Sequence, residues 1–320
     1  MAEPFSNDQR TLDRLFDHAI APKLKGLERD RQAARADRRR RWLTGIGGTL
    51  AAMGASSLFG LASGWTPGGH LQSALILTVL GVFGVFAWAS LASEEYQDKI
   101  CKMLVDPLIE LEGFERYERS PSVSLDRYEN LSIIGTSSSR DLEDLIAGTY
   151  RNCRFELFEA TLERKSGKNS TTTVFEGQLM QISMPLHIKG SVIITYDYGS
   201  WLNSIGGWFR SGTRVEIPHA AFEKDYEVYA EHPEEALKLI TPGFVQNFLR
   251  LRQLLGSEKI TAAFKGDHFY MGVNDGKKIM EKVSINTPAE ELRATFHEVA
   301  DEIAIVHRII DQLHEPVTTS

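Results

Sequence analysis

Three residues near the C-terminus, His307, Asp311 and His314, have the types and the spacing of metal ligands. They lie at positions i, i+4 and i+7, so a helix would place them on one face. Two imidazoles and one carboxylate can bind zinc or iron. However, the three residues flank an apolar helical stripe on its solvent-facing edge, where charged groups are common. We therefore interpret them as a solvated edge and predict no metal site.

The other reactive residues do not have the spacing of a catalytic motif. His219, His232 and His268 do not form the zinc-binding pattern H-E-x-x-H. The sequence contains no G-x-S-x-G, P-loop or G-x-G-x-x-G pattern, so acyl transfer, nucleotide hydrolysis and dinucleotide binding have no support. The two cysteines, Cys101 and Cys153, form no C-x-x-C pair, which fits a reducing compartment. We predict no catalytic residue and no cofactor.

A glycine-containing stretch at residues 199–212 carries several large apolar side chains. We call four of them the contact loop: Trp201, Leu202, Trp208 and Phe209. Large aromatic residues in a flexible loop often bind something. The partner could be the domain's own core, another protein or a nearby membrane, and the sequence leaves these alternatives open.

Strand patterns dominate the middle of the chain. Candidate strands cover residues 153–163, 173–184, 186–196, 214–218 and 222–230. In the first of them the alternation of apolar residues slips once after Leu157, which suggests a bulge. Residues 259–273 are predicted to form a hairpin that turns at residues 265–267. About seven antiparallel strands with inserted helices result, which predicts the α+β class.

Helical signals lie between and after the strands. Thr241 and Pro242 cap and start one helix. A last helix repeats apolar residues at alternating spacings of four and three from Leu292 to Leu313. This seam needs an apolar partner. We favour the helix predicted at residues 94–118, with the sheet or the same helix of a second copy as alternatives.

The sequence has no Asp, Glu, Lys or Arg over residues 42–93, although a quarter of the chain is charged. Residues 43–63 and 73–93 are each long enough, as a helix, to span the roughly 30 Å of bilayer hydrocarbon. A turn with Gly and Pro lies between them, so we predict a transmembrane helical hairpin. Small residues recur every four from Gly48 to Gly64, which would let another helix approach closely. A cleaved signal peptide does not fit, because a long charged segment precedes the first span.

Charge bias predicts the orientation of this hairpin. Arg35, Arg38, Arg39, Arg40 and Arg41 precede the first span, and the turn has no Lys or Arg. Positive flanks stay in the cytoplasm, so both termini and the body of the protein are expected there. The basic segment would also attract anionic lipid headgroups. Residues 42–320, by contrast, carry a net charge of −11, which disfavours nucleic acid as a partner.

The stretch at residues 214–251 resembles the signature of a bacterial membrane-protein family, catalogued as domain of unknown function 3137. The matching features are Phe175-Glu176-Gly177, Phe222 through Tyr229, Glu235-Ala236 and Leu239 through Pro242. The resemblance covers residues 94–315 and implies a cytosolic α+β domain carried by two membrane helices. It assigns no catalytic residue. The same positions also fit a folding role, in which Gly177 permits a close backbone approach.

Together these observations predict five segments and a location. The segments are a basic helical one at 1–41, the transmembrane hairpin at 42–93, a cytosolic, mainly antiparallel α+β domain at 94–286, a long C-terminal heptad helix at 287–315 and a tail at 316–320. The expected location is the bacterial inner membrane, with two spans. The expected function is a non-catalytic, membrane-anchored interaction or scaffold module, whose partner is an unknown protein or a second copy. The alternative is an enzyme with an unrecognised site in the sheet–helix cleft.

Overall fold

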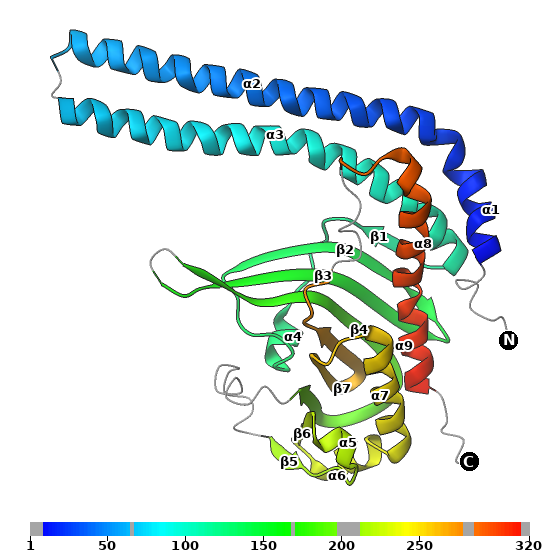
Figure 1. Ribbon diagram of the computed structural model, residues 1–320. Coiled ribbons are helices and arrows are strands. Elements are labelled where there is room, and N and C mark those ends of the chain that lie inside the picture. The colour runs from blue at the N-terminus through cyan, green and yellow to red at the C-terminus, as the bar shows by residue number, and fades with distance from the viewer. Residues whose placement is uncertain (1–8, 65–66, 168–169, 197–211, 278–284, 315–320) are drawn as a thin grey trace. The chain divides into compact units, whose positions relative to one another are not determined.

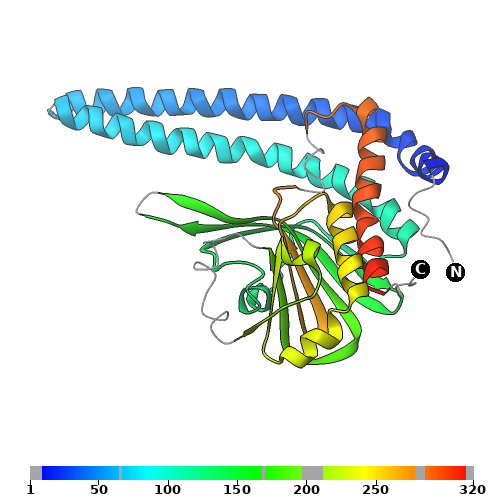
Figure 2. The ribbon, with the colours of Figure 1, turned by 60° about the horizontal axis from the view of Figure 1, so that its bottom comes forward.

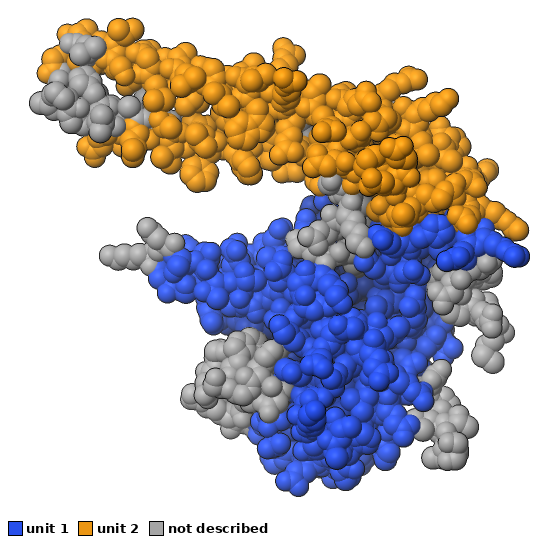
Figure 3. Space-filling view, viewed as in Figure 1, with its two compact units in different colours: residues 1–12, 105–281, 297–320 blue, residues 13–104, 282–296 orange. Residues whose placement is uncertain are grey.

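The computed structural model describes residues 9–64, 67–167, 170–196, 212–277 and 285–314. The chain forms two compact units, which Figure 3 distinguishes by colour. Unit 1 comprises residues 1–12, 105–281 and 297–320, and unit 2 comprises residues 13–104 and 282–296.

Unit 1 contains, within its described residues, a seven-stranded antiparallel sheet (Figure 1). The strands are β1 (Arg116–Glu118), β2 (Ser139–Tyr150), β3 (Cys153–Lys165), β4 (Thr171–Tyr196), β5 (Thr213–Val215), β6 (Tyr226–Ala230) and β7 (Ile260–Val273). Their order is β1-β2-β3-β4-β6-β5, and β7 pairs with β4. An antiparallel sheet combined with helices is the α+β architecture that the strand patterns predict.

β4 and β7 are long strands that pair with each other along most of their length. Between the pairs Gln178–Val273 and Ile194–Ala262, β4 advances by 16 residues but β7 by only 11. Three of the excess residues of β4 lie between Ser183 and Ile188, around Pro185, and two lie between Ile188 and Ser191. A proline has no backbone N–H to offer a neighbouring strand, so an unpaired bulge is a favourable place for it.

Two predictions about these strands are wrong. Residues 173–184 and 186–196 belong to one strand, and residues 259–273 do not fold back as a hairpin. The alternation in β7 does change phase at Gly266. Ala263 and Tyr270 pack in the same apolar cluster, although they are seven positions apart and a regular strand would place them on opposite faces. Gly266 has φ +62°, a conformation that suits a bulge. The glycine therefore shifts the alternation without reversing the chain.

Two helices lie side by side against the sheet, α7 (Pro242–Leu255) and α9 (Ile305–His314) (Figures 1 and 2). Thr241 starts α7 as predicted, because its hydroxyl accepts a hydrogen bond from the Phe244 amide at 3.2 Å. Phe244 in turn packs on Phe264 of β7, with 5.6 Å between ring centroids. The short helices α5 (Ala220–Glu223) and α6 (Pro233–Leu239) adjoin β6.

Several residues that carry the family resemblance belong to the core of unit 1. Phe222, Tyr226 and Phe248 form an aromatic cluster with 5.2 to 5.9 Å between ring centroids. Gly177 has φ +151°, and a Cβ there would lie 2.0 Å from the carbonyl oxygen of Val273. This is the close backbone approach expected at Gly177, and it fixes how β4 sits against the end of β7.

The C-terminal seam is buried but its helix is not continuous. A 3-10 turn, η5 (Ala289–Glu291), leads into α8 (Leu292–Ile303), and α9 follows after a break at Ala304. The seam residues are at most 1% exposed in six cases: Leu292, Phe296, Val299, Ile303, Val306 and Ile310. The helix that packs along α9 is α7, and the segment 94–118 that the sequence favoured contacts α9 at its end, through Glu112 and Phe114.

Unit 2 is mainly helical. It contains the end of α1 (Gln9–Ala19), the 3-10 turn η2 (Ala21–Lys23), α2 (Leu24–Ala62) and most of α3 (Pro67–Glu112). α2 and α3 lie side by side in both views (Figures 1 and 2). Their contact depends on Gly45 and Gly81, where a Cβ would lie 2.4 Å from Val85 and from Thr49 respectively. Away from this contact both helices expose large apolar side chains, such as Phe83 at 71%.

No helix among the described residues is both long and apolar enough to cross a membrane. The predicted transmembrane spans at 43–63 and 73–93 are therefore wrong, as are the inner-membrane location and the two-span anchoring. These residues form parts of two longer helices. The first half of α2 is strongly basic and its second half is rich in Gly, Ala and Ser, whereas α3 continues past residue 93 into a charged segment. The predicted role of Arg35 and Arg38–Arg41 in membrane orientation therefore has no support. The same holds for their predicted contact with lipid headgroups.

Gly177 offers a test of the β4–β7 contact. Gly177→Ala should lower the free energy of unfolding by about 1–3 kcal/mol, because the added methyl group forces two backbones apart. Gly135→Ala is the matched control, since nothing lies within 4 Å of a Cβ at that position. Urea unfolding followed by circular dichroism measures both. Equal stability of the two variants would show that the strands do not approach closely at Gly177.

Candidate functional site

The contact loop of Trp201, Leu202, Trp208 and Phe209 lies outside the described residues. Its role stays a prediction. The basic residues at 35 and 38–41 lie on α2, where the Arg41 guanidinium contacts the Asp37 carboxylate at 2.7 Å. These residues do not come together into a site.

His307 lies in a packed interior instead of on a solvated edge. Its ring stacks on Tyr150 of β2 with 3.9 Å between centroids, and the edge of Phe114 meets it at 4.9 Å. Its Nδ1 atom lies 3.1 Å from the Glu112 carboxylate at the end of α3, and both side chains are only 4% exposed. The sequence interpretation was wrong for this residue, because α9 turns its polar edge toward β2 rather than toward water.

Asp311, one turn further along α9, is held by a second pair. The guanidinium of Arg151 lies 2.9 Å from its carboxylate, and the Tyr150 hydroxyl donates to it at 3.4 Å. Burial raises the pKa of the Tyr150 phenol above its ordinary value. The side chain of His314 lies outside the described part of the chain. Among the described residues, no group of three or more His, Cys, Asp or Glu is arranged to hold a metal ion.

One face of the sheet is covered over only part of its area. The segment around α4 (Asp126–Asn130) covers an apolar cluster, in which Tyr128 meets Phe158 of β3 and Tyr270 of β7 at 5.8 and 5.6 Å between ring centroids. On the same face of β3, Arg154 and Glu156 lie beyond that cover. The apolar half of this face is thus core, and the polar half is open.

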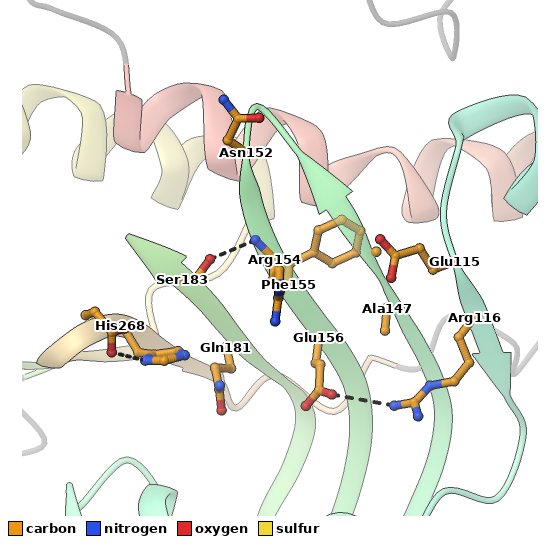
Figure 4. A pocket seen from close by; sticks show the side chains of 12 residues that line it. Glu115, Arg116, Ala147, Asn152, Arg154, Phe155, Glu156, Gln181, Ser183 and His268 are labelled. Atoms are coloured by element: carbon orange, nitrogen blue, oxygen red, sulfur yellow. Dashed lines mark hydrogen bonds and ion pairs between the residues drawn. The ribbon is translucent and has the colours of Figure 1, made fainter. Parts of the chain in front are cut away.

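The open half forms a cavity of about 790 Å³ (Figure 4). It is lined by Glu115, Arg116, Ala147, Gly148, Asn152, Arg154, Phe155, Glu156, Gln181, Ser183, Asp267 and His268. A second cavity of about 620 Å³ adjoins α4 and shares Asp267 and His268 with the first. Its other lining residues are Arg127, Asn130, Leu131, Ser191, Lys265 and Tyr270. The two cavities together make one polar surface, which we call the sheet groove.

Strand pairing sets the floor of the sheet groove. Cross-strand partners place Ala147, Glu156, Gln181 and Tyr270 in one row across β2, β3, β4 and β7. In the next row Ser183 of β4 faces His268 of β7. The Ser183 hydroxyl accepts a hydrogen bond from the Arg154 amide at 2.7 Å, which Figure 4 shows as a dashed line.

β1 forms one side of the sheet groove and is fixed by a buried aspartate. The Tyr117 hydroxyl donates to the Asp144 carboxylate at 2.6 Å, and Arg119 lies 3.7 Å from it. Asp144 is 3% exposed, so this pairing is needed to bury its charge. The neighbouring Arg116 then reaches over the groove and contacts Glu156 at 3.5 Å.

Asp267 and His268 lie at the junction of the two cavities. The Asp267 carboxylate is 2.6 Å from His268 Nδ1. Its own backbone amide and the imidazole hold the pKa of Asp267 below its ordinary value. The carboxylate therefore stays ionised as the pH falls toward its unfolded-state pKa. In the second cavity, the Arg127 guanidinium donates to the Tyr270 hydroxyl at 2.8 Å, and this hydrogen bond raises the pKa of Arg127.

Sequence analysis missed the sheet groove, although β3 carries a signal for it. Arg154 and Glu156 occupy the same alternate positions as Phe158 and Leu162, so one face turns from polar to apolar along the strand. A bulge does lie opposite Leu157–Glu159, but its extra residue belongs to β2, between Glu143 and Ile146, whereas β3 pairs regularly with β4 there. Both faces of β3 are buried at this point, which makes the pattern look shifted.

A family described as "Protein of unknown function (DUF3137)" matches residues 173–315. The resemblance is thus confirmed for the part of the chain from β4 onward, which includes Gln181, Ser183, Asp267 and His268. No curated protein matches the chain. Among solved structures, the chain is similar to the crystal structure of the mycobacterial trehalose monomycolate transport factor A, TtfA, at 10% identity and a TM-score of 0.33. This similarity covers 66% of this chain and 94% of the other, and at so low a TM-score it carries no argument.

The buried pair of Glu112 and His307 gives a test of the packing around α9. Glu112→Met or His307→Leu alone should each cost about 3–5 kcal/mol, since either leaves one buried partner unpaired. The double variant should cost clearly less than the sum of the two. Urea unfolding measures all three.

A surface pair serves as the control. Lys238 and Glu235 are 3.0 Å apart with Lys238 72% exposed, so Lys238→Met should cost under about 1 kcal/mol. Simple additivity of the Glu112 and His307 changes would show that the two side chains do not interact.

Proposed function

We propose that this protein is an interaction module, which binds an extended polar segment of a partner protein along the sheet groove. One observation carries the proposal. A single sheet face is divided into an apolar half under the α4 segment and a polar half on which no described element lies. A face that served only as core would carry apolar residues under a complete cover, whereas this one stays polar and open.

The size of the sheet groove favours an extended segment over a compact small molecule. Each of the two cavities falls within the roughly 300–1,000 Å³ typical of small-molecule sites. Because they share Asp267 and His268, they join into a surface that is longer than either alone. A stretch of extended chain fits such a shape.

The side chains that line the sheet groove also suit a peptide backbone. Asn152 and Gln181 can each donate and accept hydrogen bonds, and so can Asn130 in the second cavity. A peptide in extended conformation presents donors and acceptors in alternation, and it can be bound through such groups with little demand on its sequence.

Peptide selection against the full chain tests this function. Peptides enriched from a random phage-displayed library should protect the variant Gln181→Cys from maleimide, with labelling about tenfold slower at a peptide concentration of ten times Kd. The native thiols should react slowly, because Cys101 and Cys153 are at most 2% exposed and burial raises the pKa of Cys153.

Leu237→Cys is the control for this experiment. Leu237 is 56% exposed on α6, away from the groove residues, so peptide should not change its labelling. If the enriched peptides protect neither cysteine, or both alike, the sheet groove is not the binding surface.

The sheet groove also favours a second candidate, an esterase-like hydrolase. Ser183, His268 and Asp267 are the residue types of a nucleophile, a general base and an orienting acid. Ser183 faces His268 across the β4–β7 ladder, and Asp267 contacts the imidazole at 2.6 Å. This set differs from the sheet–helix cleft that the sequence suggested. It is the weaker candidate, because among the described residues the Ser183 hydroxyl accepts a hydrogen bond from the Arg154 amide but forms none with the His268 imidazole that would act as its base.

An activity-based probe decides this second candidate. A hydrolase would be labelled by a fluorophosphonate at Ser183, and both Ser183→Ala and His268→Gln would abolish the labelling. Ser139→Ala, at the exposed start of β2, would leave it intact. Absence of labelling on the folded wild-type chain, read by mass spectrometry of intact protein, would exclude a reactive serine.

A further inference from the structure

The three carboxylates that line the first cavity of the sheet groove already have partners. Glu115 accepts a hydrogen bond from the Thr149 hydroxyl at 2.8 Å, Glu156 lies 3.5 Å from Arg116, and Asp267 lies 2.6 Å from His268 Nδ1. Arg116 is further engaged by Glu118 at 3.4 Å. The charges of Glu156, Asp267 and Arg116 therefore face a partner that can carry the opposite charge, whereas Glu115 meets only a neutral hydroxyl.

Two guanidinium groups of this surface have no described partner of opposite charge in ion-pair contact. Arg154 lies on the floor of the first cavity and Arg127 on the wall of the second. Among the ion pairs of the described residues, neither has a carboxylate partner. Arg127 donates to the neutral hydroxyl of Tyr270 at 2.8 Å and interacts with Asp267 only at longer range. Each half of the surface thus presents one guanidinium that is in ion-pair contact with no carboxylate of the described residues.

We infer that the partner segment is acidic, and that its carboxylates bind Arg154 and Arg127. This inference rests on the proposed function, since it specifies the ligand of the same surface. A guanidinium binds a carboxylate through two parallel hydrogen bonds, which gives both affinity and a fixed orientation. Arg154 lines the first cavity and Arg127 the second, and Asp267 and His268 line both. One extended chain that passes over the junction could place an acidic side chain on each arginine.

Acidic peptide fits this surface better than nucleic acid. The carboxylates of the groove and the net charge of −7 on the whole chain oppose a dense row of phosphates. The same charges oppose a peptide far less, because its carboxylates can be spaced to meet the two arginines. The polar amide and hydroxyl groups between them remain available for the peptide backbone.

Fluorescence anisotropy with the full chain tests the inference. The probe is a fluorescein-labelled peptide of alternating Glu and Gly, four of each, and its counterpart replaces Glu by Gln. The Glu peptide should bind at least about tenfold more tightly than the Gln peptide. Arg154→Gln and Arg127→Gln should each weaken its binding about tenfold, and added salt should weaken it further.

Arg250→Gln is the matched control. Arg250 is an exposed residue of α7 and does not line either cavity, so its loss changes net charge equally and should leave binding unchanged. Thermal unfolding by circular dichroism checks that every variant is folded. Inorganic phosphate is a separate arm: displacement of the Glu peptide by phosphate, with no preference for Glu over Gln, would reduce the site to a free-anion site.

Two further outcomes would overturn the inference. Equal binding of the Glu and Gln peptides, with both protecting Gln181→Cys, would refute the acidic class but keep the peptide-binding function. Tighter binding of a labelled single-stranded oligonucleotide than of the Glu peptide, lost in Arg154→Gln, would assign the arginines to nucleic acid. Failure of every peptide to protect Gln181→Cys would instead contradict the proposed function itself.

Discussion

The pairing of β4 with β7 is the interaction on which the rest of unit 1 depends. β4 offers one edge to β7 over its length, and its other edge to β3 and then to β6. Without β7, a long row of backbone amides and carbonyls of β4 would need other partners, and buried groups of this kind are rarely left unpaired. The same pairing brings Ser183 opposite His268, so the ladder that holds the sheet together also lays the floor of the sheet groove.

One sheet face carries both a part of the core and the proposed binding surface. Under the α4 segment the face carries residues such as Phe158, Leu162 and Leu179, all fully buried. Each contributes about 1.5–3 kcal/mol to folding by leaving water. Arg154, two alternate positions before Phe158, contributes no such burial and has no described counterion. Under the proposed function such a residue serves binding, and α4 marks where the core part of the face ends and the proposed binding part begins.

Some of this fold follows from local sequence signals. The cap formed by Thr241 and the buried positions of Phe222 and Tyr226 could be predicted, because each depends on neighbours in the chain. The phase change at Gly266 was visible too, but whether it bends a strand or reverses it depends on β4, far away in the sequence. The break at Ala304 was hidden, since the apolar spacing continues through it. The charge-free residues suggested membrane spans, because a window restricted to residues 42–93 leaves out the charged parts of the longer helices that contain them.

The sheet groove could not be predicted from the sequence, for a related reason. Its residues come from α4 and from β1, β2, β3, β4 and β7, and only the register of the sheet brings Arg154 near Ser183 and His268. The alternation of polar and apolar residues in β3 indicates a partly open face, but it does not say which distant strands complete that face. Similarly, the contact of His307 with Glu112 depends on how α9 is rotated against β2, which the helical spacing alone does not determine.

The bulge around Pro185 has a consequence for how this protein can vary in length. Between Ser183 and Ile188, β4 has three more residues than the facing stretch of β7, and these residues make no regular ladder contacts. Insertions or deletions within residues 184–187 would leave the registers on both sides as they are. A single deletion in β7 on the C-terminal side of Gly266 would instead exchange the two faces of the strand, carrying His268 to the helix side and Phe269 to the open side. Homologous chains should therefore differ in length in β4 near Pro185, whereas β7 should keep a constant number of residues.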